Sequence, residues 1–173
     1  ARIEEVKGHI YLIEAAEKMI KNGKNIKVLI IGTGSLENSL KEKVKEKGLE
    51  KNIIFTGFIS NVNEILSILD VQANASFGTE ATSLSLLEGM SLGIPAVVSN
   101  YGGNPGVITN GENGYIFKVK DSGDMAACLT KLMENSDIYE YMKKRCVEIF
   151  NEKFTAEIYA RNIENVYTEL MKK

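Results

Sequence analysis

The sequence predicts an α/β protein built on a doubly wound parallel β-sheet, because short apolar runs alternate with helical patterns along the chain. The run 27–31 is apolar without alternation, which is typical of a parallel strand buried on both faces. A helical pattern lies on either side of it, and Gly32 turns the chain where it ends. Residues 1–173 are expected to form one domain, since this length suits a single core.

The elements are justified in order by their apolar spacing. The first helix, about 8–22, has its stripe at Ile10, Ile13 and Ala16, and the charged helix 35–47 has one at Leu40 and Val44. The predicted strands are 27–31, 52–55, 71–75, 95–99 and 114–118. The predicted helices are 8–22, 35–47, 62–69, 82–92, 122–133, 137–151 and 155–171, with one further turn at 107–110.

Composition and charge exclude several classes of function. Hydrophobic residues make up 44% and charged residues 25% of the chain, as in an ordinary globular protein. The formal net charge of −2 gives no support for nucleic acid or an anionic membrane as the main partner. The cysteines, Cys128 and Cys146, fall in separate helical patterns, so we expect reduced thiols and neither a disulfide nor a metal site.

The segment 81–111 stands out because Glu88 is its only charged residue, with Glu80 just before it. Leucines and methionines surround Glu88, so we expect this segment to be packed inside the protein. A buried carboxylate costs several kcal/mol unless it is paired. Glu88 therefore either makes a structural hydrogen bond or accepts hydrogen bonds from the hydroxyls of a bound ligand.

The start of the helix 82–92 favours a ligand. Thr82 or Ser83 is a suitable N-cap, and Gly93 and Pro95 end the helix. The free N–H groups of residues 83–85 would then point at an anion such as phosphate. A ligand with a diphosphate, a sugar and a ribose would reach these amides and both glutamates, which is the shape of a nucleotide-sugar.

The carboxyl ends of the predicted strands converge on the same edge of the sheet, where ligands of such folds bind. Gly32, Gly57, 76–80 and 101–103 all fall there. Gly32–Thr33–Gly34 also resembles the start of a dinucleotide fingerprint, but Glu37 replaces its third glycine, which argues against NAD.

Three residues near the start of the chain have two interpretations each. Arg2 and Lys7 are either surface charges or a pair that neutralises a diphosphate. His9 is the only histidine, which excludes chemistry that needs two. It is either a surface or helix-capping residue or part of the site beside Lys7.

Taken together, these residues resemble a known family. The chain is similar to the C-terminal, donor-binding domain of GT-B fold, retaining family-four glycosyltransferases (glycosyl transferases group 1). The resemblance covers essentially all of the chain and implies a Rossmann-like fold. The motifs that carry it are Arg2 with Lys7–Gly8, 30–34, 54–57, the pair Glu80 and Glu88, 87–95, and 101–103 with 113–114.

The resemblance implies three catalytic residues. Arg2 and Lys7 would bind the donor diphosphate and stabilise the departing nucleoside diphosphate, and Glu80 would hold the hexose hydroxyls. Such enzymes retain anomeric configuration and usually need no metal or other cofactor, because cationic side chains and a helix N-terminus offset the charge of the leaving group.

The resemblance also implies the residues that bind the donor. Glu88 would hold the ribose hydroxyls. The amides near Ser83 and Leu84 would touch the sugar and phosphate, and the backbone around Gly57 and Phe58 would pair with the base edge. The donor-binding residues are expected to be Glu88, Ser83, Leu84, Gly57, Phe58 and Gly32.

The chain departs from the family pattern at two places. Ala1 stands where the family commonly has glycine, and 81–83 is Ala–Thr–Ser in place of Gly–Phe–Gly. Ser83 adds a side chain beside the sugar, so the sequence does not fix the donor sugar. A UDP-sugar is the preferred prediction, used to build a surface polysaccharide or glycoconjugate.

The resemblance places the acceptor site in an N-terminal domain outside this chain, so we expect this piece to bind donor without turning it over. It implies a cytoplasmic protein, with any contact to the inner face of the membrane made by the missing part. The last helix, 155–171, has an apolar stripe that either crosses to the N-terminal domain or packs on its own sheet.

Two other functions stay open at this point. The first is a GT-B epimerase acting on a UDP-sugar, which conversion of a UDP-sugar without acceptor would favour. The second is a non-catalytic doubly wound module that binds a protein partner, which failure to bind any nucleotide would favour.

Overall fold

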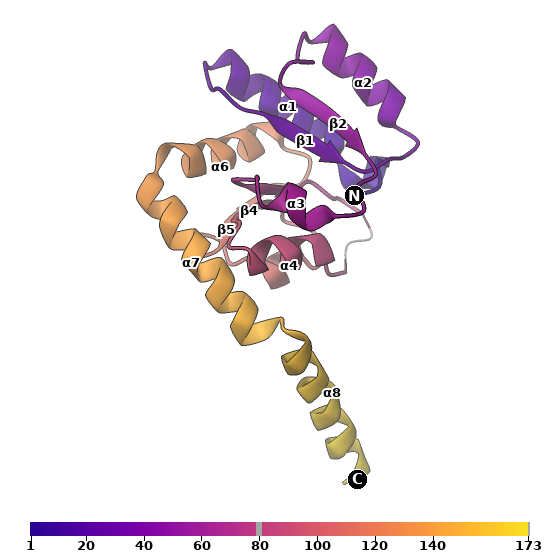
Figure 1. Ribbon diagram of the computed structural model, residues 1–173, viewed down its shortest axis with the longest axis vertical. Helices are drawn as coiled ribbons and strands as arrows, with labels where there is room; N and C mark the ends of the chain where they lie inside the picture. The colour runs from indigo at the N-terminus through magenta and orange to yellow at the C-terminus, as the bar shows by residue number, and fades with distance from the viewer. Residues whose placement is uncertain (79–80, 173) are drawn as a thin grey trace.

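The computed structural model describes residues 1–78 and 81–172. In this part of the chain every strand pair is parallel, and helices cover the strands as the sequence predicts (Figure 1). The predicted α/β, doubly wound fold is confirmed.

The strands are β1 (Val28–Ile31), β2 (Ile53–Gly57), β3 (Gln72–Asn74), β4 (Ala96–Ser99) and β5 (Gly114–Phe117). The helices are α1 (His9–Lys21), α2 (Glu37–Glu46), α3 (Val62–Leu66), α4 (Leu84–Ser91), α5 (Asn104–Val107), α6 (Ser122–Glu134), α7 (Ser136–Lys153) and α8 (Ala156–Met171), preceded by the short 3-10 helix η1 (Glu5–Lys7). The turn predicted at 107–110 was wrong. It begins earlier, at Asn104, because Pro105 suits the first turn of a helix.

The strands form two sheets, β1–β2 and β3–β4–β5, where the sequence predicted one. The N-terminal segment bonds to the chain at the end of β1. The amino group of Ala1 donates to the carbonyl of Ile31 at 2.7 Å, and Ile3 N–H donates to the carbonyl of Thr33 at 2.8 Å.

The three-stranded sheet is covered on both faces. Val97 of β4 packs with α1, β5, α6 and α7 residues on one side, while its neighbours Ala96 and Val98 pack with α4 and α7 on the other. Alternate residues of β4 therefore serve two cores, as expected for a strand at the centre of a doubly wound fold.

The two-stranded sheet is covered mainly on one face. Ile30 and Ile53 pack against α1 and α2, whereas Ile54, on the opposite side, is 43% exposed. The prediction that the run 27–31 is buried on both faces was wrong for this reason: only Ile30 of β1 is fully buried.

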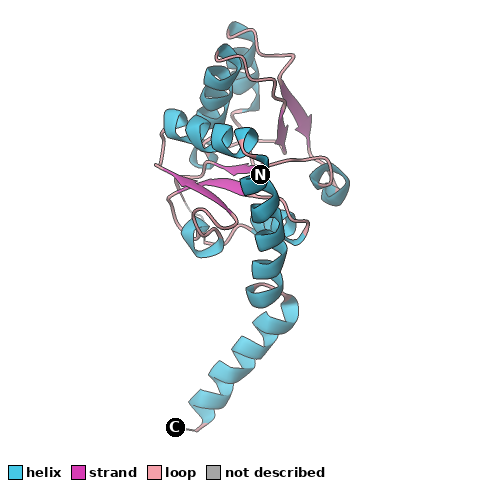
Figure 2. Ribbon diagram, turned by 90° about the vertical axis from the view of Figure 1, so that its left-hand side faces the viewer, coloured by secondary structure: helices cyan, strands magenta, loops and turns pink. Residues whose placement is uncertain are grey.

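The end of the chain extends away from the body. α7 packs on the three-stranded sheet, and α8 continues beyond it as a projecting arm (Figures 1 and 2). None of the residues of α8 that the structure describes is buried. Of the two interpretations of this helix, packing on its own sheet is therefore wrong.

Candidate nucleotide-sugar site

The loops that follow the parallel strands meet along one edge of the molecule. The N-terminal segment joins the two sheets there: Ile3 N–H bonds to Thr33 after β1, and Phe77 N–H, after β3, donates to the carbonyl of Val6 at 2.9 Å. Gly32, after β1, donates its N–H to the carbonyl of Gly57 in β2 at 2.8 Å. We call this surface the loop band, and it comprises residues 1–8, 32–34, 57–58, 75–78, 81–83 and 99–104.

Two glycines show how closely the loop band is packed. Gly8 adopts φ +67°, and a Cβ there would lie 2.2 Å from the carbonyl oxygen of Ala75. A Cβ on Gly103 would lie 1.5 Å from the carbonyl oxygen of Ala81. Side chains at these positions are excluded by backbone atoms, so the segments after β3 and β4 and the start of α1 are held in contact.

A buried polar network that the sequence analysis missed supports the same edge. Ser99, at the end of β4, donates from its hydroxyl to the carbonyl of Ser76, and the Asn104 amide donates to the Ser99 hydroxyl at 3.1 Å. Among the described residues, no donor reaches Asn104 Oδ1. The signal in the sequence was Asn104 itself, an amide between glycine and proline beside an apolar strand.

Arg2 and Lys7 both lie on the loop band. The Arg2 side chain is exposed and its guanidinium is 3.4 Å from the carboxylate of Glu4. Lys7 is half-buried and ends η1, directly before Gly8 and α1. The structure therefore brings both predicted cations to the edge where the strands end.

His9 begins α1 beside Lys7 and is half-buried there. Burial, together with the smaller effects of the positive charges of the N-terminus and Lys7, lowers the pKa of His9 from 6.5 to about 4. Within the described chain, its buried Nδ1 has no hydrogen-bond partner. His9 is therefore neutral at pH 7.

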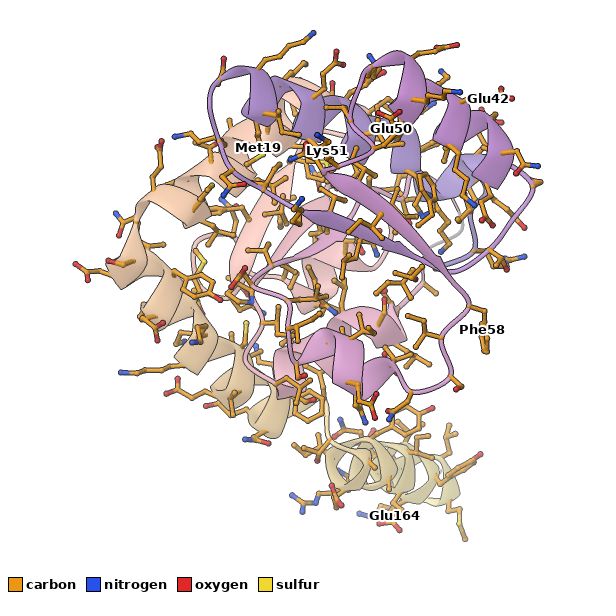
Figure 3. All side chains as sticks on the ribbon, turned by 45° about the horizontal axis from the view of Figure 1, so that its top comes forward. Met19, Glu42, Glu50, Lys51, Phe58 and Glu164 are labelled. Carbon is orange, nitrogen blue, oxygen red and sulfur yellow. The ribbon has the colours of Figure 1, made fainter. Side chains whose placement is uncertain are left out.

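Gly57 and Phe58 end β2 on the same edge. Gly57 has φ +71°, and a Cβ placed on it would meet no described atom within 4 Å, so its backbone borders open space. Phe58 is 80% exposed and points away from the body (Figure 3). Space beside Gly57 is thus open to a ligand, while its carbonyl is held by the N–H of Gly32.

The start of α4 also lies at this edge, beside the contact between Ala81 and Gly103. Ser83 is the N-cap and is buried, and Leu84 is 71% exposed. The Ser83 hydroxyl does not cap the helix in the described structure but lies 3.0 Å from the hydroxyl of Ser85. The first amides of α4 are left for an acceptor outside the helix.

Glu88 is exposed, so the expectation that its segment is packed entirely inside was wrong. The reason is that α4 buries one face only, with Leu86, Gly89 and Met90 turned inward. The exposed carboxylate needs no hidden partner. Glu80, the other predicted glutamate, lies outside the described residues.

The structure thus brings Arg2, Lys7, Gly32, Gly57, Phe58, Ser83 and Leu84 to the ends of the parallel strands, and places Glu88 on the helix that leaves this edge.

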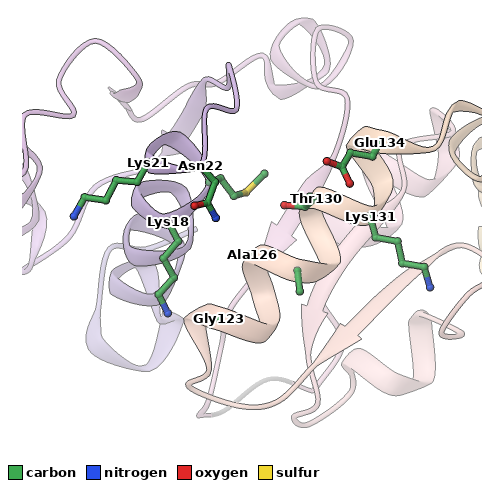
Figure 4. A pocket seen from close by; sticks show the side chains of 10 residues that line it. Lys18, Lys21, Asn22, Gly123, Ala126, Thr130, Lys131 and Glu134 are labelled. Atoms are coloured by element: carbon green, nitrogen blue, oxygen red, sulfur yellow. The ribbon is translucent and has the colours of Figure 1, made fainter.

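A hollow of about 630 Å³ lies elsewhere, between α1 and α6 (Figure 4). Lys18, Lys21, Thr130 and Glu134 line it, and none of the predicted site residues does. The lysines there already have partners: Lys18 donates to the Ser122 hydroxyl, Lys21 to Glu17, and Lys131 lies over the Tyr115 ring. The loop band, which holds the predicted residues, is therefore the candidate site.

The described residues offer neither a metal site nor a membrane-spanning helix. No group of three or more histidine, cysteine, aspartate or glutamate side chains there is placed to hold a metal ion. Likewise, the helices in residues 1–78 and 81–172 include none with the length and apolar character to cross a membrane.

Comparison with known proteins identifies the sequence family. The model of the family "Glycosyl transferases group 1" matches residues 1–147. N-acetyl-alpha-D-glucosaminyl L-malate synthase of Bacillus anthracis is 30% identical over 84% of this chain and 38% of its own length. UDP-Gal:alpha-D-GlcNAc-diphosphoundecaprenol alpha-1,3-galactosyltransferase of Escherichia coli is 26% identical over 98% of the chain and 44% of its length. The chain spans less than half the length of these relatives.

Solved structures share the fold. The C-terminal domain of a glycosyl transferase group 1 family protein (LpcC) from Francisella tularensis superposes with a TM-score of 0.80 and 31% identity, over 90% of this chain and 83% of that one. Anabaena Alr3699/HepE, in complex with UDP, superposes with a TM-score of 0.88 at 20% identity, over 97% of this chain and 47% of that one. The second likeness concerns the fold alone.

Proposed function

The chain belongs to the glycosyl transferases group 1 family, and we propose that it is the donor-binding domain of a retaining glycosyltransferase. The whole protein would transfer a sugar from a nucleotide-diphosphate sugar, with a UDP-sugar as the expected donor. The observation that carries this proposal is the loop band, where two cations, the start of α4 and open backbone at Gly57 share one edge.

The proposed mechanism follows from the charge that develops during transfer. When the bond between the anomeric carbon and phosphate breaks, negative charge accumulates on the departing nucleoside diphosphate. Arg2 and Lys7 would offset this charge together with the first amides of α4, at Ser83 and Leu84. No metal is needed for that step if these groups suffice, and we propose that the enzyme works without one.

The remaining contacts would fix the donor in place. The exposed Glu88 carboxylate would accept hydrogen bonds from the ribose hydroxyls, and Glu80 from the hexose hydroxyls. The base edge would pair with backbone around Gly57 and Phe58, next to the turn at Gly32. This chain alone is proposed to bind donor without transferring it, because the acceptor would be held by the rest of the protein.

The names of the relatives support the biological setting of this proposal. The E. coli relative acts on a diphosphoundecaprenol-linked sugar, and another, from Staphylococcus aureus, is a poly(ribitol-phosphate) alpha-N-acetylglucosaminyltransferase. We propose a role in building a cell-surface polysaccharide or glycoconjugate. The reaction would take place in the cytoplasm, with any membrane contact made by the rest of the protein.

Calorimetric titration of this chain with UDP, GDP, UDP-glucose and GDP-mannose tests the proposal. We expect one base class to bind with a Kd of about 0.1–1 mM, since half a cleft binds weakly. Glu88→Ala should weaken that binding at least about fivefold by removing the acceptor for the ribose hydroxyls. The matched control is Glu42→Ala, which removes an exposed carboxylate from α2.

Equal binding by the wild-type protein and Glu88→Ala would contradict the assignment of Glu88. No binding of any of the four nucleotides would overturn the proposed function for this chain.

A further inference from the structure

Gln72 is a buried polar side chain that the proposed function leaves unexplained. It lies in β3, is 8% exposed, and sits beneath α4. Its backbone is fixed by the sheet, because its N–H donates to the carbonyl of Pro95 at 2.9 Å and the residue pairs with Ala96 of β4. A rigid strand thus presents a flexible amide to the helix that bears Glu88.

The Gln72 amide makes one directional contact with α4. Its Nε2 donates to the carbonyl oxygen of Ser85 at 2.9 Å, in the first turn of the helix. The reversed amide would set two oxygens against each other, so this acceptor fixes which atom is the nitrogen. The contact ties the start of α4 to β3.

Gly89 provides the space for this contact. A Cβ on Gly89 would lie 2.3 Å from Cδ and Oε1 of Gln72 and 2.4 Å from Nε2. Since Gly89 is one turn after Ser85, both stand over the same point of the strand. The amide therefore occupies the volume that a side chain at position 89 would fill.

This arrangement is costly for stability alone. Glycine inside a helix is about 0.5–1 kcal/mol less favourable than alanine. In the described part of the chain, no donor reaches the buried Gln72 Oε1, and a buried acceptor without a partner costs about 1–3 kcal/mol. An apolar residue at 72 facing alanine at 89 would avoid both costs. Local costs of this kind concentrate at functional sites.

The contact controls the part of α4 that the proposed function uses. Within the described residues no side chain caps the helix at Ser83, so its start lacks the usual tie. Gln72 instead holds this turn from the strand side, through its hydrogen bond to the carbonyl of Ser85, two residues after the N-cap. This turn carries the amides of Leu84 and Ser85, and Glu88 follows in the next turn of the same helix.

We propose that Gln72 is a positioning residue for the nucleotide-sugar donor: its amide, seated against Gly89, holds the first turn of α4 in the orientation that binds the donor. This inference rests on the proposed function. Gln72 does not touch the donor but acts through the Ser85 carbonyl.

The test compares Gln72→Met with wild-type protein in titrations with UDP, GDP, UDP-glucose and GDP-mannose. Methionine keeps the length of the side chain and removes both the hydrogen bond and the unpaired oxygen. We expect the Kd of the nucleotide that binds wild-type protein to rise about five- to tenfold, while the melting temperature does not fall. Donor-induced NMR shifts should shrink at Leu84 and Ser85 and persist at Gly57.

The matched control is Asn52→Ala, which removes an amide hydrogen bond of the same length, 2.9 Å to the carbonyl of Ile26, at the other end of β2 from Gly57. Its Kd should stay within about twofold of wild type. If Gln72→Met does not fold, the double variant Gln72→Ala/Gly89→Ala replaces it. Alanine at position 89 then fills the space that the Gln72 amide leaves, and the same rise in Kd is expected.

The outcomes separate the two claims. Binding by wild-type protein together with a Kd within twofold for Gln72→Met overturns the positioning role and leaves the proposed function intact. Uniform loss of shifts with a lowered melting temperature also overturns it, because that result marks a purely structural residue. Absence of nucleotide binding by wild-type protein overturns the proposed function, and the role of Gln72 with it.

Discussion

The two sheets of this protein differ in how they are covered, and the proposed site lies where they meet. β3–β4–β5 has a core on each face, so that Val97 and Val98 point into different clusters. β1–β2 shares a single cluster with α1 and α2 and leaves Ile54 on the surface. The N-terminal segment bonds to both parts, through Ile3 and Val6.

The proposed site draws its residues from the junction rather than from either sheet alone. Arg2 and Lys7 come from the connecting segment, while α4 follows the three-stranded sheet and Gly57 ends the two-stranded one. A donor bound along the loop band would therefore touch both sheets and the segment between them. Its affinity should then depend on how the two sheets are placed relative to each other.

The largest expected effect tests the unequal coverage. Phe117→Ala in β5 removes a fully buried ring from the larger core and should lower the free energy of unfolding by about 3–5 kcal/mol. Ile54→Ala in β2 should cost less than about 1 kcal/mol, because that side chain is already 43% exposed. Urea denaturation measures both. Equal costs would contradict the difference between the two sheets.

The next effect concerns the junction itself. Gly8→Ala should lower the free energy of unfolding by about 3 kcal/mol, because the new Cβ meets the Ala75 carbonyl at a positive φ. Gly23→Ala is the control at the other end of α1: φ is +80° there, but a Cβ would meet no described atom within 4 Å, so the cost should be about 1 kcal/mol. Thermal unfolding of both variants gives the comparison, and a Gly8→Ala protein as stable as Gly23→Ala would show that the close contact is absent.

His9 adds a pH dependence at the same junction. Its pKa falls from 6.5 to about 4 on folding, chiefly through burial, so the folded state resists protonation. This contribution is complete above pH 6.5 and is lost as the pH falls from 6.5 to about 4, by about 3 kcal/mol in all. His9→Gln should show a correspondingly flatter loss of stability over that range. A parallel pH profile for the two proteins would contradict burial of the imidazole.

The smallest effect lies in α8, which neither sheet covers. Leu170→Ala should change the free energy of unfolding by less than about 0.5 kcal/mol, since this side chain is mostly exposed. Ile149→Ala on α7, where the side chain packs in the core, should cost about 2–4 kcal/mol. A large loss from Leu170→Ala would mean that α8 packs against the body in solution.

Local pattern was enough to predict most elements and to predict that the loops after the strands meet at one edge. Apolar periodicity located the strands and long helices, and glycines such as Gly32 and Gly57 marked where strands end. The separation into two sheets was not predictable, because it depends on which strands pair across long distances in the sequence. The exposure of Glu88 was also missed, since an apolar sequence does not reveal that a helix buries only one face.

Polar residues inside the fold were the other gap. Gln72 and Asn104 each interrupt an apolar or glycine-rich stretch, and nothing near them in sequence indicates their partners, Ser85 and Ser99. Such contacts join segments that only the folded structure brings together, whereas the cations Arg2 and Lys7 were recognisable from their place in a motif.

The most direct test of the central claim is a map of backbone amide shifts during titration of this chain with UDP. The account predicts that the largest shifts fall on the loop band and α4, at Gly57, Ser83 and Glu88. Shifts centred instead on Lys18, Asn22 and Thr130, which line the hollow between α1 and α6, would contradict the site at the junction of the two sheets.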